Sequence, residues 1–186
     1  MAARQGRPGR SARADQIVAA ARHLLEREGP EALTMRRVGE ELGIRAPSLY
    51  KHLTSKKAIE VALIEEAFRD IGAALHAALE GRDNPVDATR SLLATYRRFG
   101  LAQPNLYRLA TAGRLPRGDL TPGLEEWAGE PFLLVTGEPH LAQALWSFAH
   151  GMVILEIDGR YPQNSELDQT WETGAAAFAG LVGARR

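Results

Sequence analysis

Histidine and carboxylate side chains are the groups of this sequence that could perform acid–base or metal chemistry, but their spacing favours neither. His150 precedes Glu156 by six residues and Asp158 by eight. On a helix, the first pair would lie about 240° apart, and the second about 80° apart with an offset of two turns. Neither pair converges on one substrate atom. His140 and His150 have no i, i+4 partner for a metal, and the chain has no cysteine. We therefore expect no catalysis, no cofactor and no metal.

Three polar residues share one face of an otherwise apolar stretch. Gln143, Ser147 and His150 fall at i, i+4 and i+7, so a helix places them on one side. Polar groups that interrupt an apolar wall can orient a small ligand in a cavity. The alternative is a stripe that faces solvent or an interface, with His150 hydrogen-bonded in the core.

The charge distribution suggests two parts with different partners. Residues 1–57 carry 12 Arg or Lys against 6 Asp or Glu, a net charge of +6, and residues 58–186 carry 11 against 17, a net charge of −6. All three lysines, Lys51, Lys56 and Lys57, lie within seven positions of one another. A basic segment of this kind is typical of a surface that binds a polyanion. Chance clustering or a solvated face is the alternative.

The elements that must position these residues are helices. Apolar residues recur with the helical period throughout, and no alternating run of β-branched residues is bounded by hairpin signals. We predict an all-α fold of about nine helices, with Pro131 kinking or splitting the seventh. The predicted helices cover about 12–28, 34–43, 46–52, 55–81, 85–102, 105–113, 124–136, 139–158 and 165–182.

The second and third helices form a helix-turn-helix pattern. Thr34 can cap the second helix, and Gly43 ends it after Met35, Val38 and Leu42. Two residues later the third helix begins, and the longer first helix braces the pair. The third helix is therefore the predicted recognition helix.

The segment from Ala32 to Ala58 resembles the DNA-binding domain of the tetracycline-repressor (TetR) family. The resemblance rests on the capped Thr34, the Leu42-Gly43-Ile44 turn, Leu49-Tyr50-Lys51-His52, and the Ser55-Lys56 start of the fourth helix. It implies that the third helix enters the major groove of DNA. It also implies a DNA-binding set in which Arg36 contacts a guanine or a phosphate and Lys56 contacts a phosphate. That set is Arg36, Arg45, Ala46, Pro47, Ser48, Tyr50, Lys51, His52 and Lys56. For Tyr50 and His52, packing against the first and fourth helices is the alternative.

Two positions depart from the family pattern, and the N-terminal arm adds a further expectation. Arg45 stands where many members cap the third helix with Ser or Thr, and Leu53 replaces a frequent Phe. Residues 1–12 are predicted to be a flexible basic arm. Within it Gly6-Arg7-Pro8 resembles a minor-groove hook, and a disordered tail that adds only charge is the alternative.

The remainder, 58–186, is predicted to be a helical domain for ligand binding and dimerisation, after a DNA-binding domain at 13–57. Trp146, His150 and Gly151 resemble the Trp…His-Gly signature of one class of TetR-family regulatory domains. By this resemblance the last two helices of two chains form a four-helix bundle, helped by small residues from Gly174 to Gly180. Candidate ligand residues are Gln143, Ser147 and His150 with the aromatic residues Tyr96, Phe99, Tyr107, Trp127, Trp146 and Phe148, although aromatic residues at this spacing also build plain cores.

The resemblance implies a homodimeric transcriptional repressor that binds a double-stranded DNA operator and is released by a small apolar effector. The alternatives are a DNA-binding regulator without an effector and a small α-helical enzyme. The apolar stretch 141–157 contains Gln143, Ser147, His150 and Glu156 and is too short for a membrane span. The Arg-rich start also lacks the apolar segment of a signal peptide. We expect a cytoplasmic protein.

Overall fold

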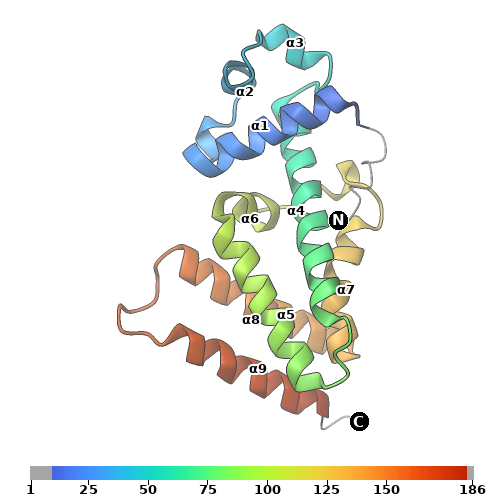
Figure 1. Ribbon diagram of the computed structural model, residues 1–186, viewed down its shortest axis with the longest axis vertical. Helices are drawn as coiled ribbons and strands as arrows, with labels where there is room; N and C mark the ends of the chain where they lie inside the picture. Colours follow the sequence, from blue (N-terminus) through green and yellow to red (C-terminus); the bar gives the residue numbers. More distant parts are fainter. Residues whose placement is uncertain (1–9, 184–186) are drawn as a thin grey trace.

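The computed structural model describes residues 10–183, which form nine α-helices and no strand within that range (Figure 1). Two short 3₁₀ turns, Pro30–Ala32 and Arg117–Asp119, lie between α-helices of this series. The all-α prediction is therefore confirmed, and the predicted helix limits agree to within a few residues. The helices are α1 (Ala12–Glu28), α2 (Met35–Glu41), α3 (Ala46–Tyr50), α4 (Lys56–Leu79), α5 (Pro85–Ala102), α6 (Pro104–Thr111), α7 (Leu124–Thr136), α8 (Pro139–Ile157) and α9 (Leu167–Gly183).

Side-chain caps begin several helices where the sequence indicated them. The Thr34 hydroxyl accepts from the Arg37 backbone N–H at 3.2 Å, and the Ser55 hydroxyl accepts from Ala58 N–H at 3.1 Å. Each cap satisfies one of the backbone donors that a helix start leaves without a partner. Arg45 gives α3 no side-chain cap, as its place in the family pattern predicted.

The first three helices form a small head at one end of the molecule (Figure 1). Leu49 of α3 is fully buried beneath α1 and α2, and Leu53 is buried after it. Gly43 adopts a φ of 65° in the turn between α2 and α3, a conformation that glycine reaches without steric cost. The tight turn and the buried Leu49 together set the direction of α3.

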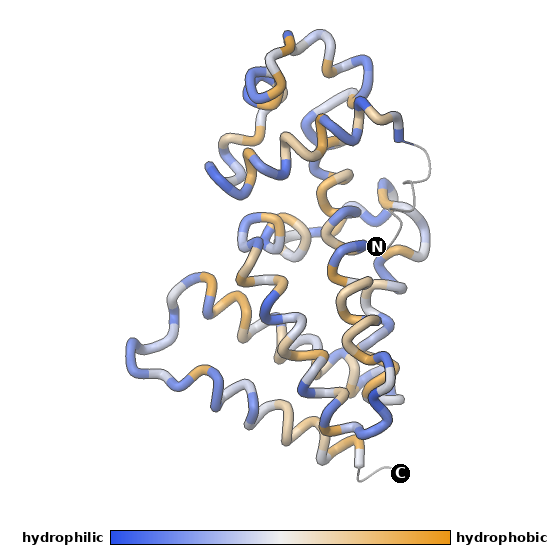
Figure 2. Tube along the Cα trace, viewed as in Figure 1, coloured by the Kyte–Doolittle hydropathy of each residue, from blue (hydrophilic) through white to orange (hydrophobic). Residues whose placement is uncertain are grey.

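Helix α4 runs out of the head and along the second group of helices (Figure 1). Its 24 residues span about 36 Å at 1.5 Å per residue. Ile59 and Leu63, near its start, belong to the same apolar core as α1–α3, whereas Ile71 and Leu75 belong to the core of α5, α7 and α8. Figure 2 shows hydrophobic residues, in orange, recurring along α4. One helix therefore contributes to both cores.

Pro131 does not split α7, which continues from Leu124 to Thr136. A proline cannot donate to the carbonyl four residues earlier, here that of Trp127. His76 of α4 fills that place, because its Nε2 lies 3.1 Å from the Trp127 carbonyl oxygen and donates to it. The His76 ring also stacks on the Trp127 indole at 5.2 Å between centroids. A neighbouring helix thus supplies the donor that Pro131 lacks.

The small residues of α9 divide between two sides. Gly174 faces Phe148 of α8 so closely that a Cβ atom there would lie 2.1 Å from Phe148 Cζ. Ala175 and Ala179 are buried in the same packing, while Ala176 and Gly180 are exposed. Close packing within one chain therefore uses only some of the small residues of α9. Among residues 10–183, no helix is long and apolar enough to cross a membrane.

Candidate nucleic-acid interface and ligand cavity

The predicted DNA-binding residues around α3 lie on the exposed side of the head. Tyr50 is 49% exposed and His52 is exposed, whereas the flanking apolar residues Leu49 and Leu53 are buried in the core. The exposure of His52 and of half of Tyr50 favours a surface role over packing against α1 and α4. Ala46 is the first residue of α3. The other exposed members of the set in and beside α3 are Arg45, Pro47, Ser48 and Lys51.

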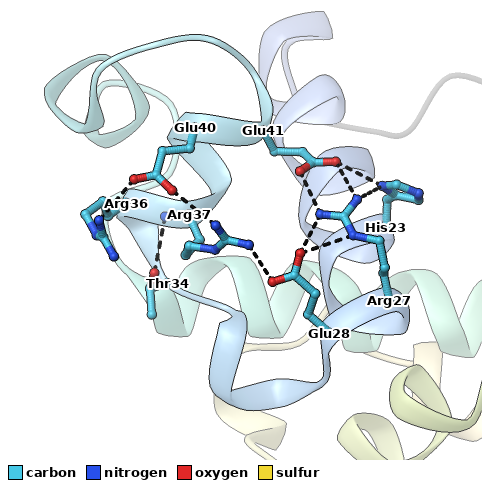
Figure 3. A network of polar contacts seen from close by, with 8 residues as sticks. All are labelled: His23, Arg27, Glu28, Thr34, Arg36, Arg37, Glu40 and Glu41. Atoms are coloured by element: carbon cyan, nitrogen blue, oxygen red, sulfur yellow. Dashed lines mark hydrogen bonds and ion pairs between the residues drawn. The ribbon is translucent and has the colours of Figure 1, made fainter.

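Arg36 projects from the first turn of α2, and its side chain is 79% exposed. One guanidinium nitrogen, Nη1, donates to Glu40 at 3.1 Å (Figure 3). The other guanidinium nitrogens form no hydrogen bond with the described residues. A guanidinium with free neighbouring donors matches either the O6/N7 edge of guanine or a phosphate.

A network of ion pairs behind Arg36 ties α2 to α1 (Figure 3). Arg37 contacts both Glu40 and Glu28, and Arg27 donates to Glu28 at 2.7 Å and to both oxygens of Glu41 at 3.0 Å. The Arg27 hydrogen bonds, followed by that of His23, lower the pKa of Glu41 to about 2. The sequence analysis missed this network, since its partners lie up to 18 positions apart.

The lysines that begin α4 have different surroundings. The Lys56 ammonium lies 3.5 Å from Glu60, one turn along the same helix. The Lys57 ammonium lies 2.7 Å from Asp119, in the 3₁₀ turn before α7. Lys51 forms no ion pair with residues 10–183, so its charge is fully available to a polyanion. Lys57 instead links the start of α4 to the segment before α7.

The predicted arm falls largely outside the described residues, which begin at residue 10. Arg10 lies 3.9 Å from Asp15 and 3.8 Å from Glu65 of α4. Ser11 then caps α1, so the last two residues of the predicted arm already belong to this helix start. The minor-groove hook at Gly6-Arg7-Pro8 lies outside the described part of the chain.

A cavity of about 1120 Å³ lies among α4–α8 and the segment 112–117. Its wall is mainly apolar, with Ile64, Phe68 and Ile71 from α4 and Phe132 from α7. The charged lining residues come from three places only: the first two turns of α4, the segment 112–117 and the first turn of α7. They are Lys57, Glu60, Arg114, Arg117, Glu125 and Glu126. Five predicted ligand residues line the cavity: Tyr96, Phe99, Tyr107, Gln143 and Trp146.

Trp127 and Phe148 do not line the cavity, because each packs on a helix elsewhere. The Trp127 ring lies over Gly72 of α4, where a Cβ atom would approach it to 2.5 Å. The Phe148 ring packs against Trp171 and Phe178 of α9. Both are aromatic residues at helical spacing that serve packing instead of ligand binding.

Ser147 and His150 also lie outside the lining, so the predicted polar face is displaced around α8. Ser147 is exposed and donates to the Gln143 carbonyl oxygen at 2.8 Å. Trp146, one position earlier, turns toward the cavity instead. His150 lies one turn beyond Trp146 and contacts the wall from behind, with its Nδ1 2.8 Å from the Tyr107 hydroxyl. His150 is therefore hydrogen-bonded, as that alternative has it, but it is half-buried at the edge of the core.

The cavity wall contains a hydrogen-bonded row of four side chains from three helices. The Trp146 indole N–H donates to the Tyr96 hydroxyl at 3.1 Å, and the Tyr96 and Tyr107 hydroxyls lie 2.9 Å apart. The Tyr107 hydroxyl then meets His150. Burial raises the pKa of Tyr96 to about 12 and raises that of Tyr107 further. Burial lowers the pKa of His150, and no charged neighbour contributes to that shift.

The cavity wall is joined directly to the head through α6. Glu26 of α1 accepts from the backbone N–H of Leu106 at 2.6 Å and so caps the start of α6. The Asn105 amide donates in return to the carbonyls of Leu25 and Glu26, at 3.1 and 3.2 Å. Tyr107, which follows Leu106 in α6, lines the cavity. Sequence reasoning missed the role of Glu26 because its partner lies 80 positions away.

Comparison with known sequences gives matches to both parts of the chain. The profile of bacterial regulatory proteins of the tetR family matches residues 17–63, and that of the tetracyclin repressor-like C-terminal domain matches residues 89–178. An uncharacterized HTH-type transcriptional regulator of Mycobacterium tuberculosis is 32% identical over 164 residues, which cover 82% of this chain and 73% of the relative.

Solved structures share the fold over nearly the whole chain. A protein of unknown function from Rhodococcus sp. RHA1 has a TM-score of 0.78 at 19% identity, and the match covers 95% of this chain and 98% of the other. The Streptomyces coelicolor TetR family protein ActR, in complex with (S)-DNPA, has a TM-score of 0.68 at 19% identity over 93% and 98%. A TetR variant from Acinetobacter baumannii, in complex with minocycline, has a TM-score of 0.65 at 21% identity over 91% and 96%.

Proposed function

The chain belongs to the tetR family of bacterial regulatory proteins, and from this premise we propose that it is a homodimeric repressor released from its DNA operator by a small, largely apolar ligand. One observation carries the proposal: α4 begins beside the exposed α3 and continues into the wall of the 1120 Å³ cavity. The single helix α4 therefore connects the proposed DNA-binding helix α3 to the ligand cavity.

The proposed DNA contact places α3 in the major groove. Ser48, Tyr50 and Lys51 then face base edges and phosphates, and Lys56 contacts the adjoining backbone. Arg45 offers a further charge to the backbone at the start of α3. Arg36 reaches the groove from α2 with its free guanidinium donors. A dimer on a palindrome would place its two half-sites about one helical turn, roughly 34 Å, apart or somewhat more.

The proposed dimer joins the outer faces of α8 and α9. Ser147 and Leu155 on α8, and Ala177 and Leu181 on α9, are exposed in the single chain. Two such helices from each chain can bury these residues in a four-helix bundle, where small side chains permit close approach. A two-fold dimer would match the symmetry of a palindromic operator.

The proposed effector enters the apolar cavity. Tyr96, Tyr107, Trp146 and Gln143 supply polar groups to a wall that is otherwise apolar, which is the usual composition of a small-molecule site. ActR in complex with (S)-DNPA and the TetR variant in complex with minocycline support the proposal, since both share this fold. Ligand binding releases DNA only if the ligand prefers the conformation that does not fit the operator.

The test begins with selection of bound DNA from a random duplex library by the full chain. We expect a palindromic consensus bound by an even number of chains, measured by fluorescence anisotropy and sedimentation. Screening small apolar compounds against that complex should then identify one that releases the DNA. A monomer at micromolar concentration that binds no duplex would contradict the regulator proposal, and specific binding that no compound relieves would favour a regulator without an effector.

A further inference from the structure

Trp146, Tyr96, Tyr107 and His150 form a row of hydrogen bonds. The direction of donation is fixed at the Trp146 end of this row. An indole N–H only donates, so the Tyr96 oxygen must accept from Trp146. When Nδ1 of His150 carries no proton, Tyr107 donates to it and Tyr96 donates to Tyr107. Each indole and hydroxyl proton of the row then has an acceptor within the row, and neither tyrosine offers a donor to the cavity.

A proton on Nδ1 of His150, whether in the neutral Nδ1–H tautomer or in the imidazolium, reverses the rest of the row, and only the imidazolium also supplies a positive charge. His150 then donates to Tyr107, Tyr107 donates to Tyr96, and Tyr96 accepts from both Tyr107 and Trp146. The Tyr96 proton is left without an acceptor among the described residues. A buried hydroxyl proton without a partner is costly, and Tyr96 is a cavity-lining residue, so the contents of the cavity must accept that proton.

We propose that the cavity takes an apolar carboxylic acid, bound as its carboxylate against the Tyr96 hydroxyl, and that His150 takes up one proton from solvent as this ligand enters. The inference rests on the proposed function, because it specifies the chemistry of the effector. The Tyr96 proton is donated to the carboxylate as a hydrogen bond. The positive charge on the imidazolium balances the charge that the ligand brings into an apolar site.

Charge pairing around His150 supports this assignment. An apolar cavity holds a carboxylate only when a counter-charge is near, and the lining residues beside Tyr96, such as Phe132, Ala142 and Trp146, carry none. The titratable groups directed at His150 are the hydroxyls of Tyr107 from α6 and, through it, Tyr96 from α5. The charged groups on the surrounding helices are paired elsewhere: Arg97 with Glu156 and Asp168, and Arg108 with Asp158.

His150 is therefore the protonatable group at this end of the cavity that has no carboxylate partner in the described chain. Burial holds its pKa below the ordinary value of 6.5, so the imidazole is mainly neutral at pH 7 before the ligand enters. A carboxylate at the other end of the row raises that pKa. By linkage, acid strengthens binding of the carboxylate to the same extent.

The test uses two fluorescent probes, 1-pyrenebutyrate and its uncharged alcohol 1-pyrenebutanol, with the full chain and no DNA. Affinity is measured between about pH 8.5 and about pH 5.5, and proton uptake by calorimetry in buffers of different ionisation enthalpy. Between the pKa values of free and bound His150, we expect pyrenebutyrate affinity to rise up to about tenfold per pH unit, with uptake approaching one proton. Pyrenebutanol should bind with no uptake and no pH dependence.

Matched variants identify the group that takes the proton. His150→Gln and Tyr107→Phe should abolish the pH dependence for pyrenebutyrate and keep pyrenebutanol affinity, with folding checked by circular dichroism. Arg114→Gln removes the rival positive charge of the cavity lining and should leave the pH dependence intact, because an arginine does not titrate in this pH range. Loss of carboxylate binding in Arg114→Gln alone would overturn the proposal. So would zero proton uptake, or no pyrenebutyrate binding by the wild type at about pH 5.5. Operator release is measured separately, so its failure would count against the repressor proposal only.

Discussion

Arg36 reaches toward the proposed DNA surface with part of its guanidinium already held. Glu40 accepts from Nη1, while Arg37 shares the same carboxylate at 3.4 Å. A side chain restricted in this way loses less conformational entropy when it binds than a free arginine does. The restriction lowers the entropic cost of either contact, to a guanine edge or to a phosphate.

We predict that Arg36→Ala weakens operator binding by about 1–3 kcal/mol and that this loss depends on one base position. The physical reason is the loss of a paired contact to guanine O6 and N7. The measurement is affinity against a library of single-base operator variants. A loss of equal size on every variant would reassign Arg36 to a phosphate contact.

Lys56→Ala should weaken binding to all duplexes alike and reduce the slope of log affinity against log salt by about 1, because one phosphate contact is lost. Lys57→Ala is the matched control. The Lys57 ammonium is held by Asp119 at 2.7 Å, so its removal should leave the slope unchanged. Equal slopes for the two variants would remove Lys56 from the interface.

The pKa of Glu41 makes the head sensitive to acid. In the folded state it is lowered from 4.5 to about 2, chiefly by hydrogen bonds from Arg27. Its stabilising contribution is complete above the unfolded value and is lost as the pH falls through about 2. We predict that Glu41→Gln reduces the fall in melting temperature between about pH 4.5 and about pH 2. Glu31→Gln, which removes an exposed carboxylate without an ion pair to the described residues, is the control and should not.

At the scale of helices, α7 depends on its neighbour α4. Pro131 removes a backbone donor from the middle of α7, and His76 of α4 replaces it at the Trp127 carbonyl. A helix that contains a proline is thereby kept continuous and attached to α4. This matters for the cavity, because α4 and α7 both contribute to its wall.

We predict that His76→Ala destabilises the protein by about 1–2 kcal/mol, since it leaves the Trp127 carbonyl without its donor. In a Pro131→Ala background the loss should be smaller, because residue 131 can then donate to that carbonyl itself. Denaturant unfolding of the four proteins of this double-mutant cycle measures the difference. Additive losses would show that His76 acts through its other contacts, the stacking on Trp127 and the Glu130 carboxylate 3.6 Å away.

In the whole molecule, two connections join the cavity to the head. Helix α4 carries Lys56 at its start and lines the cavity over its next turns. Helix α6 lines the cavity with Tyr107 and is capped at its start by Glu26 of α1. A ligand that moves either wall therefore changes the placement of the head, within the limit of its differential affinity for the two states.

Gly129 offers a direct test of the cavity. It lines the cavity, and a Cβ atom there would meet nothing within 4 Å, so a large side chain can enter without a clash at its base. We predict that Gly129→Trp abolishes release of DNA by an identified inducer and keeps operator affinity within about threefold, or roughly 0.7 kcal/mol. The measurement is anisotropy of labelled operator during inducer titration.

Gly118→Trp is the control for this experiment. Gly118 also has open space at the Cβ position, but it does not line the cavity. This variant should respond to the inducer as the wild type does. A normal response of Gly129→Trp would place the inducer elsewhere in the molecule.

The sequence by itself determined the elements. Helical periodicity, caps such as Thr34 and Ser55, and breakers such as Gly43 act through neighbours within a few residues, so their effect is readable along the chain. The same local pattern located the helix-turn-helix. The resemblance to a family then assigned roles to these positions.

Only the tertiary structure decided how side chains from different helices meet. Ser147 and Trp146 differ by one position on α8, and the rotation of that helix against α5 and α6 placed Trp146 in the cavity wall and left Ser147 exposed. The continuity of α7 through Pro131 likewise depended on His76 of another helix, 51 positions from its acceptor. The physical reason is the same in both cases. Helical periodicity specifies an apolar face to within about one residue, or 100°, whereas a hydrogen bond requires its partners within about 3 Å.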